Sequence, residues 1–188
     1  KVAKERLQKR VHETSIVALI KRNKLQTHRA VQNAVSIREN ARKEIKSLDS
    51  LGLMLAGISL YWAEGYKRPI IHNGKAQTHH PVSLTNSDPF LVKMFLRFLR
   101  EICDISEEKI RAEVRIYEHQ NEGHLLEFWS RTTQIPPSRF GKFYYGISKS
   151  SQGKRPFDIL PYGTIQIRVN STNLYHKIMG WIEGLANT

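Results

Sequence analysis

The amino-acid sequence predicts an α+β domain over residues 49–188, in which an antiparallel sheet carries helices on one face only. Its helical and extended patterns follow the order helix, strand, strand, helix, strand, short helix, strand, strand, helix. The later strands alternate apolar and polar side chains, which is typical of strands with one buried face. Residues 1–48 differ in composition and are predicted as a basic helical arm or linker.

The arm carries most of the net charge. Residues 1–48 contain 13 Lys or Arg against 4 Asp or Glu, and the whole chain has a formal charge of +13. This balance favours polyanionic partners, above all nucleic acid and less a membrane surface. The arm has no Gly or Pro and few periodic apolar positions, which predicts one or two helices, a break near Thr14–Ser15 or Asn23, and no independent core. Two interpretations are compatible with each other: the arm lies along DNA phosphates, and it is a solvated linker after a further N-terminal domain.

Composition also bears on the cellular compartment. No run reaches the ~18 apolar residues of a membrane span, and no apolar signal region follows the basic start. The single cysteine, Cys103, is expected as a buried thiol in a reducing compartment. We therefore expect an intracellular protein, cytoplasmic or associated with the nucleoid, without a membrane partner. The sequence contains no P-loop, dinucleotide fingerprint or nucleophilic triad.

The first helix of the domain follows the N-cap Asp49 and presents two stripes. A large apolar stripe is expected to face the core: Leu51, Leu55, Ile58 and Trp62. A second stripe contains small residues and is expected as the interface of a homodimer: Gly52, Ala56, Ser59 and Ala63. Gly destabilises a helix interior by ~1 kcal/mol relative to Ala, so its place among small residues indicates that another backbone comes close.

This helix ends at Glu64 and Gly65, with Gly65 expected as a left-handed C-cap. A carboxylate at this end is unfavourable in the helix dipole. Pairing of two such helices explains both features, since each brings a Glu64 carboxylate to one point, where a divalent cation such as Mg²⁺ relieves their repulsion. The alternative is an ordinary core helix with an exposed Glu in its last turn.

The other elements follow from local patterns. The expected strands are residues 66–72, 82–86, 109–118, 140–149 and 162–170. The expected helices are residues 90–103, 121–134 and 171–185, the first of them started by Asn86–Pro89. Asn73–Gly74 predicts a turn, followed by a long polar connection to residue 81. Residues 150–161 are expected as a basic loop.

The face of the sheet opposite the core is predicted to bind DNA. Its side chains are rich in hydrogen-bond donors suited to phosphates and base edges: Arg111, Arg115, Tyr117, Lys142, Tyr144, Gln166 and Arg168. The segments between the strands add further candidates: Lys67, Arg68, Lys75, Gln77, His79, His80, Lys154 and Arg155. A metal pair at His79 and His80 is disfavoured, because adjacent residues of an extended chain point to opposite faces. The alternative for any single strand is an ordinary solvated face.

The segment Gly57–Gly65, GISLYWAEG, resembles the LAGLIDADG motif of homing endonucleases. Ser59 and Ala63 stand at the tightly packed small positions and Glu64 at the terminal acid. The match departs at Gly57–Ile58, where the motif has Leu-Ala, and at Trp62, where it has a first acid.

The resemblance would cover residues 49–185, with the helix at 121–134 as an insertion. It implies an αββαββα core whose curved sheet lies in the major groove of DNA. Members of this family often carry a helix-turn-helix domain upstream, of which residues 1–48 show no clear sign.

The function implied by the resemblance is site-specific binding of double-stranded DNA and metal-dependent phosphodiester cleavage. One motif implies a homodimer and a pseudo-palindromic target. The metal, Mg²⁺ or Mn²⁺, is expected at Glu64 and Gly65. The implied catalytic residues are Glu64, Lys149 and Gln166, with Lys67 as an alternative lysine.

Two other functions stay open. The first is a catalytically inactive, DNA-binding transcriptional regulator in which Glu64 caps or pairs locally, and the missing first acid favours it. The second is an RNA-binding or splicing-assisting protein, which would prefer structured RNA to duplex DNA.

Overall fold

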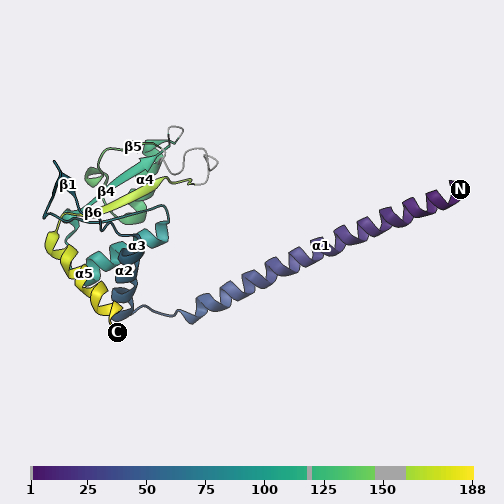
Figure 1. The fold of residues 1–188 in the computed structure, drawn as a ribbon, viewed down its shortest axis with the longest axis horizontal. Helices are drawn as coiled ribbons and strands as arrows, with labels where there is room; N and C mark the ends of the chain where they lie inside the picture. Colours follow the sequence, from purple (N-terminus) through teal and green to yellow (C-terminus); the bar gives the residue numbers. More distant parts are fainter. Residues whose placement is uncertain (1, 118–119, 147–159) are drawn as a thin grey trace. The chain divides into compact units, whose positions relative to one another are not determined.

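The computed structural model describes residues 2–117, 120–146 and 160–188 (Figure 1). The chain divides into two compact units, Lys1–Leu48 and Asp49–Thr188. The second unit combines helices with a β-sheet, so the predicted α+β class is confirmed.

The first unit consists of one uninterrupted helix, α1 (Val2–Glu44). Of the one or two helices predicted, the structure therefore has one, without the break considered near Thr14–Ser15 or Asn23. Ser15 does not divert the backbone, because its hydroxyl donates to the carbonyl of Val11 at 2.8 Å within the helix. Apolar side chains of α1 such as Val17, which is 65% exposed, bury little surface in this unit.

The main sheet of the second unit has the strand order β3–β6–β4–β5. The strands are β3 (Val82–Asn86), β6 (Thr164–Val169), β4 (Ile110–Ile116) and β5 (Tyr144–Tyr145). β6 pairs antiparallel with both β3 and β4, so the last strand in the sequence lies at the centre of the sheet (Figure 1). This arrangement aligns residues on three strands into rows across the sheet.

The edge strand β5 runs parallel to β4, with Arg115 opposite Tyr144. The prediction of a wholly antiparallel sheet is wrong at this edge. Helix α4 (Glu122–Thr133) lies between the two strands in sequence and returns the chain along the sheet, as parallel neighbours require. β5 is also shorter than the strand expected at 140–149, and Lys142 precedes it.

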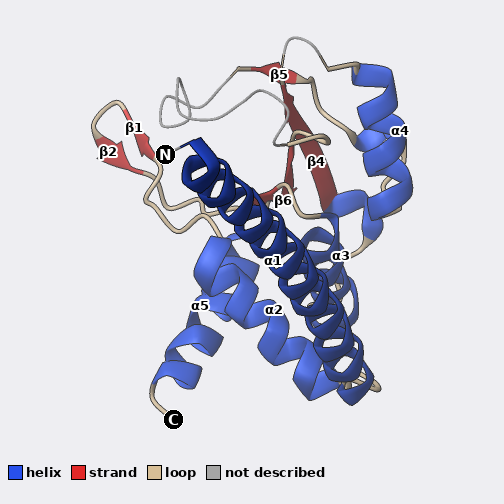
Figure 2. Ribbon diagram, turned by 90° about the vertical axis from the view of Figure 1, so that its right-hand side faces the viewer, coloured by secondary structure: helices blue, strands red, loops and turns tan. Residues whose placement is uncertain are grey.

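Helices α2 (Ser50–Glu64), α3 (Pro89–Arg97) and α5 (Thr172–Ala186) pack against β3, and α2 contacts both of the others (Figure 2). α3 continues into a π-helical turn, η1 (Phe98–Ile102), and two 3₁₀ turns follow later, η2 (Glu107–Lys109) and η3 (Pro137–Arg139). The helices cover the face onto which the strands point their apolar residues, because alternate positions of β4 and β6 are buried. The opposite face is open and polar.

Polar side chains start these helices. The Asp49 carboxylate accepts a hydrogen bond from the Gly52 amide at 2.7 Å, and the Asp88 carboxylate accepts one from the Phe90 amide at 2.8 Å. Asn121 and Ser171 cap α4 and α5 in the same way. The predicted starts of α2 and α3 are confirmed.

The strand expected at 66–72 is mostly absent. Tyr66 donates its amide to the carbonyl of Ser83 at 2.8 Å, but Pro69 has no amide to continue the ladder. The chain instead forms a separate hairpin of β1 (Ile71–His72) and β2 (Lys75–Ala76). Its turn is Asn73–Gly74, with φ of 50° and 72°, which confirms the predicted turn.

Helix α2 buries a different face from the one expected. Leu51, Leu55 and Trp62 are exposed, and of the predicted core stripe Ile58 alone is buried. The close approach occurs at Gly57, where an added Cβ would lie 2.1 Å from Cγ of Phe98. The helix therefore turns its glycine toward the aromatic core, and the larger apolar stripe faces outward.

Candidate nucleic-acid interface

The open face of the sheet presents its polar side chains in three rows. Strand register places Ser83, Arg168 and Arg111 in one row, and Thr85, Gln166 and Glu113 in the next. A third row contains Thr164, Arg115 and Tyr144. Three arginines on neighbouring strands can contact phosphates or base edges over a surface about 13 Å long, since four residues of strand separate Arg111 from Arg115.

Hydrogen bonds fix part of this face. Gln166 donates its amide to Ser83 Oγ at 2.7 Å, and Arg168 Nε donates to Asn170 Oδ1 at 2.8 Å. Arg111 donates to the carbonyl of Glu108 at 2.7 Å. Arg115 makes no hydrogen bond or ion pair with any residue that the structure describes, so its guanidinium keeps all of its donors for a ligand.

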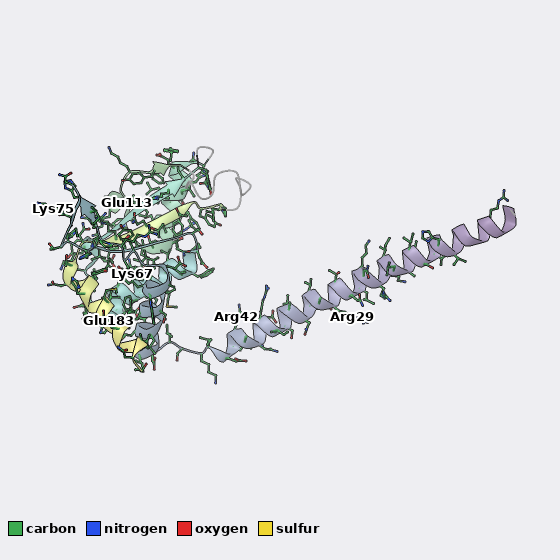
Figure 3. All side chains as sticks on the ribbon, in the orientation of Figure 1. Arg29, Arg42, Lys67, Lys75, Glu113 and Glu183 are labelled. Atoms are coloured by element: carbon green, nitrogen blue, oxygen red, sulfur yellow. The ribbon has the colours of Figure 1, made fainter. Side chains whose placement is uncertain are left out.

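Glu113 is the acid of the open face and lies opposite Gln166 (Figure 3). A carboxylate at the centre of a basic face repels phosphates and accepts from cytosine N4 or water instead. The sequence reading named neither Glu113 nor the buried Ser83 as a site residue. The strand alternation that identified Arg111 and Arg115 places Glu113 on the same face, so the signal for it was present.

The loop and hairpin candidates separate into two groups. Arg68, Lys75, Gln77 and Lys142 are exposed, and Lys75 lies on the protruding hairpin (Figure 3). His79 and His80 instead pack near the start of α5. The His80 ring stacks on Tyr175 at 4.7 Å between centroids, and the His80 backbone amide donates to Thr172 Oγ1 at 3.1 Å.

Tyr117 and Tyr144 lie with Arg115 at the β5 end of the open face. Lys149, Lys154 and Arg155 lie outside the described residues. The catalytic role expected for Lys149 therefore stays a prediction.

The C-terminal end of α2 is capped by a lysine. Lys67 Nζ donates to three backbone carbonyls, those of Tyr61 at 3.2 Å, Trp62 at 2.9 Å and Gly65 at 2.7 Å (Figure 3). An ammonium at this end is favourable in the helix dipole and offsets the adjacent carboxylate of Glu64. Lys67 thus explains locally why α2 can end on an acid.

Gly65 does not adopt the expected left-handed conformation, because its φ is −69°. Glycine is needed there for space: an added Cβ would lie 2.4 Å from both the carbonyl oxygen and the ring of Tyr61. That ring is buried, and Tyr61 Oη donates to the carbonyl of Tyr66 at 2.9 Å. Burial raises the pKa of Tyr61 well above its usual value.

The expected metal site does not fit the donors of one chain. Glu64 is exposed and forms no hydrogen bond or ion pair with described residues, so it offers a single carboxylate. The carbonyl of Gly65 already accepts the Lys67 ammonium. Over the described ranges, no group of three or more His, Cys, Asp or Glu side chains could hold a metal ion.

The outer face of α2 adjoins an apolar groove shared with the start of α3. The groove is lined by Ala56, Ser59, Leu60, Phe90, Leu91 and Met94. Phe90 is 80% exposed beside it, although phenylalanine is usually buried. Gly52 and Ala56 are half-buried and Ser59 and Ala63 are exposed on this side, so the small stripe lies outside the core. The sequence pattern placed Phe90 at the start of a helix but did not identify it as a candidate site residue, because it follows Asp88–Pro89 without a periodic apolar signal.

Cys103 is buried, as expected, and burial raises the pKa of its thiol to about 12. In the described parts of the chain, no helix has both the length and the apolar character to cross a membrane. Comparisons with protein-family models, with curated proteins and with solved structures found no match.

Proposed function

We propose that the protein binds double-stranded DNA site-specifically through the open face of its sheet. The observation that carries this proposal is the set of three arginines, Arg111, Arg115 and Arg168, on adjacent strands of an uncovered face. The net charge of +13 supports a polyanionic ligand. Helices α2, α3 and α5 stand where the αββαββα core that the LAGLIDADG resemblance implies has its helices, whereas the strand expected at 66–72 is mostly absent from the main sheet and β5 is parallel to β4.

We propose further that the binding unit is a homodimer joined through the outer face of α2. Leu55 and Trp62 are 40% and 45% exposed on this face, and the small side chains beside them let two helices approach closely. The groove against Phe90 gives each helix a recess for the partner's side chains. A two-fold dimer would read a pseudo-palindromic site.

Metal-dependent cleavage of the bound DNA, with Mg²⁺ or Mn²⁺ at paired Glu64 side chains, is the second candidate. The exposed, uncommitted carboxylate of Glu64 beside the proposed dimer face favours it. The Lys67 contact with the Gly65 carbonyl instead favours a regulator that binds DNA without cleaving it. We therefore place binding first, with Glu64 as the residue on which cleavage depends and Gln166 as a DNA contact.

Selection of bound sequences from a pool of random DNA duplexes tests the binding proposal. We expect enrichment of a pseudo-palindromic sequence, and a loss of affinity of roughly 1–3 kcal/mol for Arg115→Ala or Arg168→Ala. Arg97→Ala is the matched control, since Arg97 is exposed on α3 and pairs with Glu101 away from the sheet. Preference for structured RNA, or equal losses in the control, would contradict the proposal.

Sedimentation in solution tests the dimer. Phe90→Asp places a charge beside the apolar groove and should yield a monomer. Ile71→Asp, at a residue of the hairpin that is 60% exposed, should leave the dimer intact. The enriched duplex, incubated with Mg²⁺ or Mn²⁺, then separates the two candidates. Cleavage that is lost in Glu64→Gln while binding persists supports the nuclease, and binding without cleavage in either metal supports the regulator.

A further inference from the structure

A pocket of about 480 Å³ lies at the β5 end of the open face. Its lining combines the aromatic side chains of Tyr117, Tyr144 and Tyr145 with the polar side chains of Thr85, Arg115 and Thr164. No carboxylate is among the described residues that line it. This volume lies within the range of small-molecule sites, roughly 300–1,000 Å³, and the lining suits a flat, electron-rich ring with an attached anion.

The pocket is continuous with the proposed DNA-binding face. Thr164, Arg115 and Tyr144 occupy one row across β6, β4 and β5, and all three line the pocket. The rows that hold Gln166 and Arg168 follow along the same face. A nucleic-acid strand on that face therefore reaches the pocket without leaving the sheet.

Several contacts hold the walls of the pocket in place. Gln120 accepts from the amide of Tyr117 at 3.0 Å and donates to the carbonyl of Leu160 at 2.9 Å, so it links two residues that line the pocket. Gly163 has φ of +59°, and an added Cβ would lie 2.4 Å from the carbonyl oxygen of Arg115. The backbone there fits only glycine, which indicates a preformed site.

The groups that face the pocket differ in their availability. Tyr145 Oη donates to Glu122 Oε1 at 2.5 Å, which fixes its ring and raises the pKa of the phenol. Tyr144 is 50% exposed, and neither its hydroxyl nor the guanidinium of Arg115 has a hydrogen-bond or ion-pair partner within the described ranges. An aromatic ring and a cation are thus presented side by side.

We propose that this pocket binds the base of an unpaired nucleotide, with the base stacked on Tyr144 and the adjacent phosphate on Arg115. Stacking of a base on an aromatic side chain contributes about 1–3 kcal/mol, and it does not depend strongly on which base is bound. A paired base is not available for such stacking, because it lies inside the duplex. The inference rests on the proposed binding of nucleic acid and adds a preference within it, for DNA that carries an extrahelical nucleotide.

The test compares three labelled DNAs of one sequence by fluorescence anisotropy: the perfect duplex, the duplex with one bulged nucleotide, and the duplex with a bulged sugar-phosphate that lacks its base. We expect the bulged nucleotide to bind about tenfold more tightly than both others. Tyr144→Ala should remove this preference, and Tyr144→Phe should keep it because the ring remains. Arg111→Ala, at the far end of the face, should weaken all three equally.

Equal affinity for the three DNAs would overturn the pocket inference and leave duplex binding standing. A preference that survives Tyr144→Ala would also overturn it, because the base would then lie elsewhere. Failure to bind any of the three DNAs would contradict the proposed function itself. In that case, titration with a deoxynucleoside monophosphate tests the pocket separately. Saturable binding that Tyr144→Ala abolishes would support a base-binding pocket, and no binding would refute it.

Discussion

The two sides of helix α2 both carry apolar side chains, but one side is buried and the other is exposed to solvent. On one side Leu53, Ile58 and Tyr61 are at most 2% exposed, whereas on the other Leu51 and Trp62 are 63% and 45% exposed. Apolar side chains therefore occur all round this helix, as in helices that are buried on every side. The difference shows that the core of one chain buries half of the helix and leaves the apolar residues of the other half exposed. Variants on the two sides should accordingly affect different properties.

The largest effect is expected for Gly57→Ala on the buried side. Its Cβ would meet Cγ of Phe98 at 2.1 Å, and the Phe98 ring is itself fully buried. We expect a destabilisation of about 3 kcal/mol or more, measured by urea unfolding. The matched control is Gly180→Ala in α5, which has nothing within 4 Å of the added Cβ and should stabilise the domain by about 0.5–1 kcal/mol. A harmless Gly57→Ala would contradict the packing of this side.

Lys67→Met should have the next largest effect, at the end where both sides of α2 meet the loop. Methionine has an unbranched side chain of similar length to lysine, so the substitution mainly removes the ammonium group that contacts three backbone carbonyls. We expect a loss of about 1–2 kcal/mol in the free energy of unfolding, smaller in Lys67→Arg, because charged donors stabilise the last turn. Unchanged unfolding in both variants would show that the cap contributes nothing in solution.

Tyr61→Phe tests the one polar atom of the buried side. The carbonyl of Tyr66 loses its donor, for an expected cost of about 1 kcal/mol. The raised pKa of Tyr61 also gives a pH dependence. Above pH 10 the unfolded chain releases the phenolic proton while the folded protein retains it, so stability falls as pH rises. Unfolding curves from pH 8 to 11 should show a shallower fall in Tyr61→Phe than in the parent.

Trp62→Ser, on the exposed side, should change the stability of the monomeric domain least, by no more than about 0.5 kcal/mol. Its effect should appear in the oligomeric state instead, as dissociation of the proposed dimer in sedimentation. Unfolding measured at a protein concentration low enough to keep the protein monomeric reports the stability of the domain alone, separately from any effect on dimer formation. A cost as large as that of Gly57→Ala would remove the distinction between the two sides.

Much of the fold follows from local signals in the sequence. Asp49, Asp88 and Asn121 cap helices where the pattern predicts them, and Asn73–Gly74 forms its turn, because these interactions lie within a few residues. The sequence did not predict the parallel pairing of β5. The direction of this strand depends on the path of the chain after α4 and not on the composition of either strand.

The candidate site was predictable to a different extent. Alternation along β4 and β6 correctly placed Arg111, Arg115 and Gln166 on the face away from the apolar core. The predicted orientation of α2 was wrong. Apolar residues lie on more than one side of this helix, so the pattern alone does not decide which side faces the core. Tertiary contact with Phe98 decides between them, and no local rule contains it. The Lys67 cap depends on how the backbone turns after Gly65, which the sequence pattern did not predict either.

The central position of β6 constrains how the protein is made. Residues 164–169 supply the pairing partner of both β3 and β4, so a nascent chain that has not yet emerged past residue 169 holds two strands with unpaired edges. At a synthesis rate of about 5–20 residues per second, the interval between the emergence of β4 and of β6 lasts several seconds. During this time the edges of β3 and β4 that pair with β6 stay unpaired, so we expect the sheet to complete its pairing only after β6 has emerged.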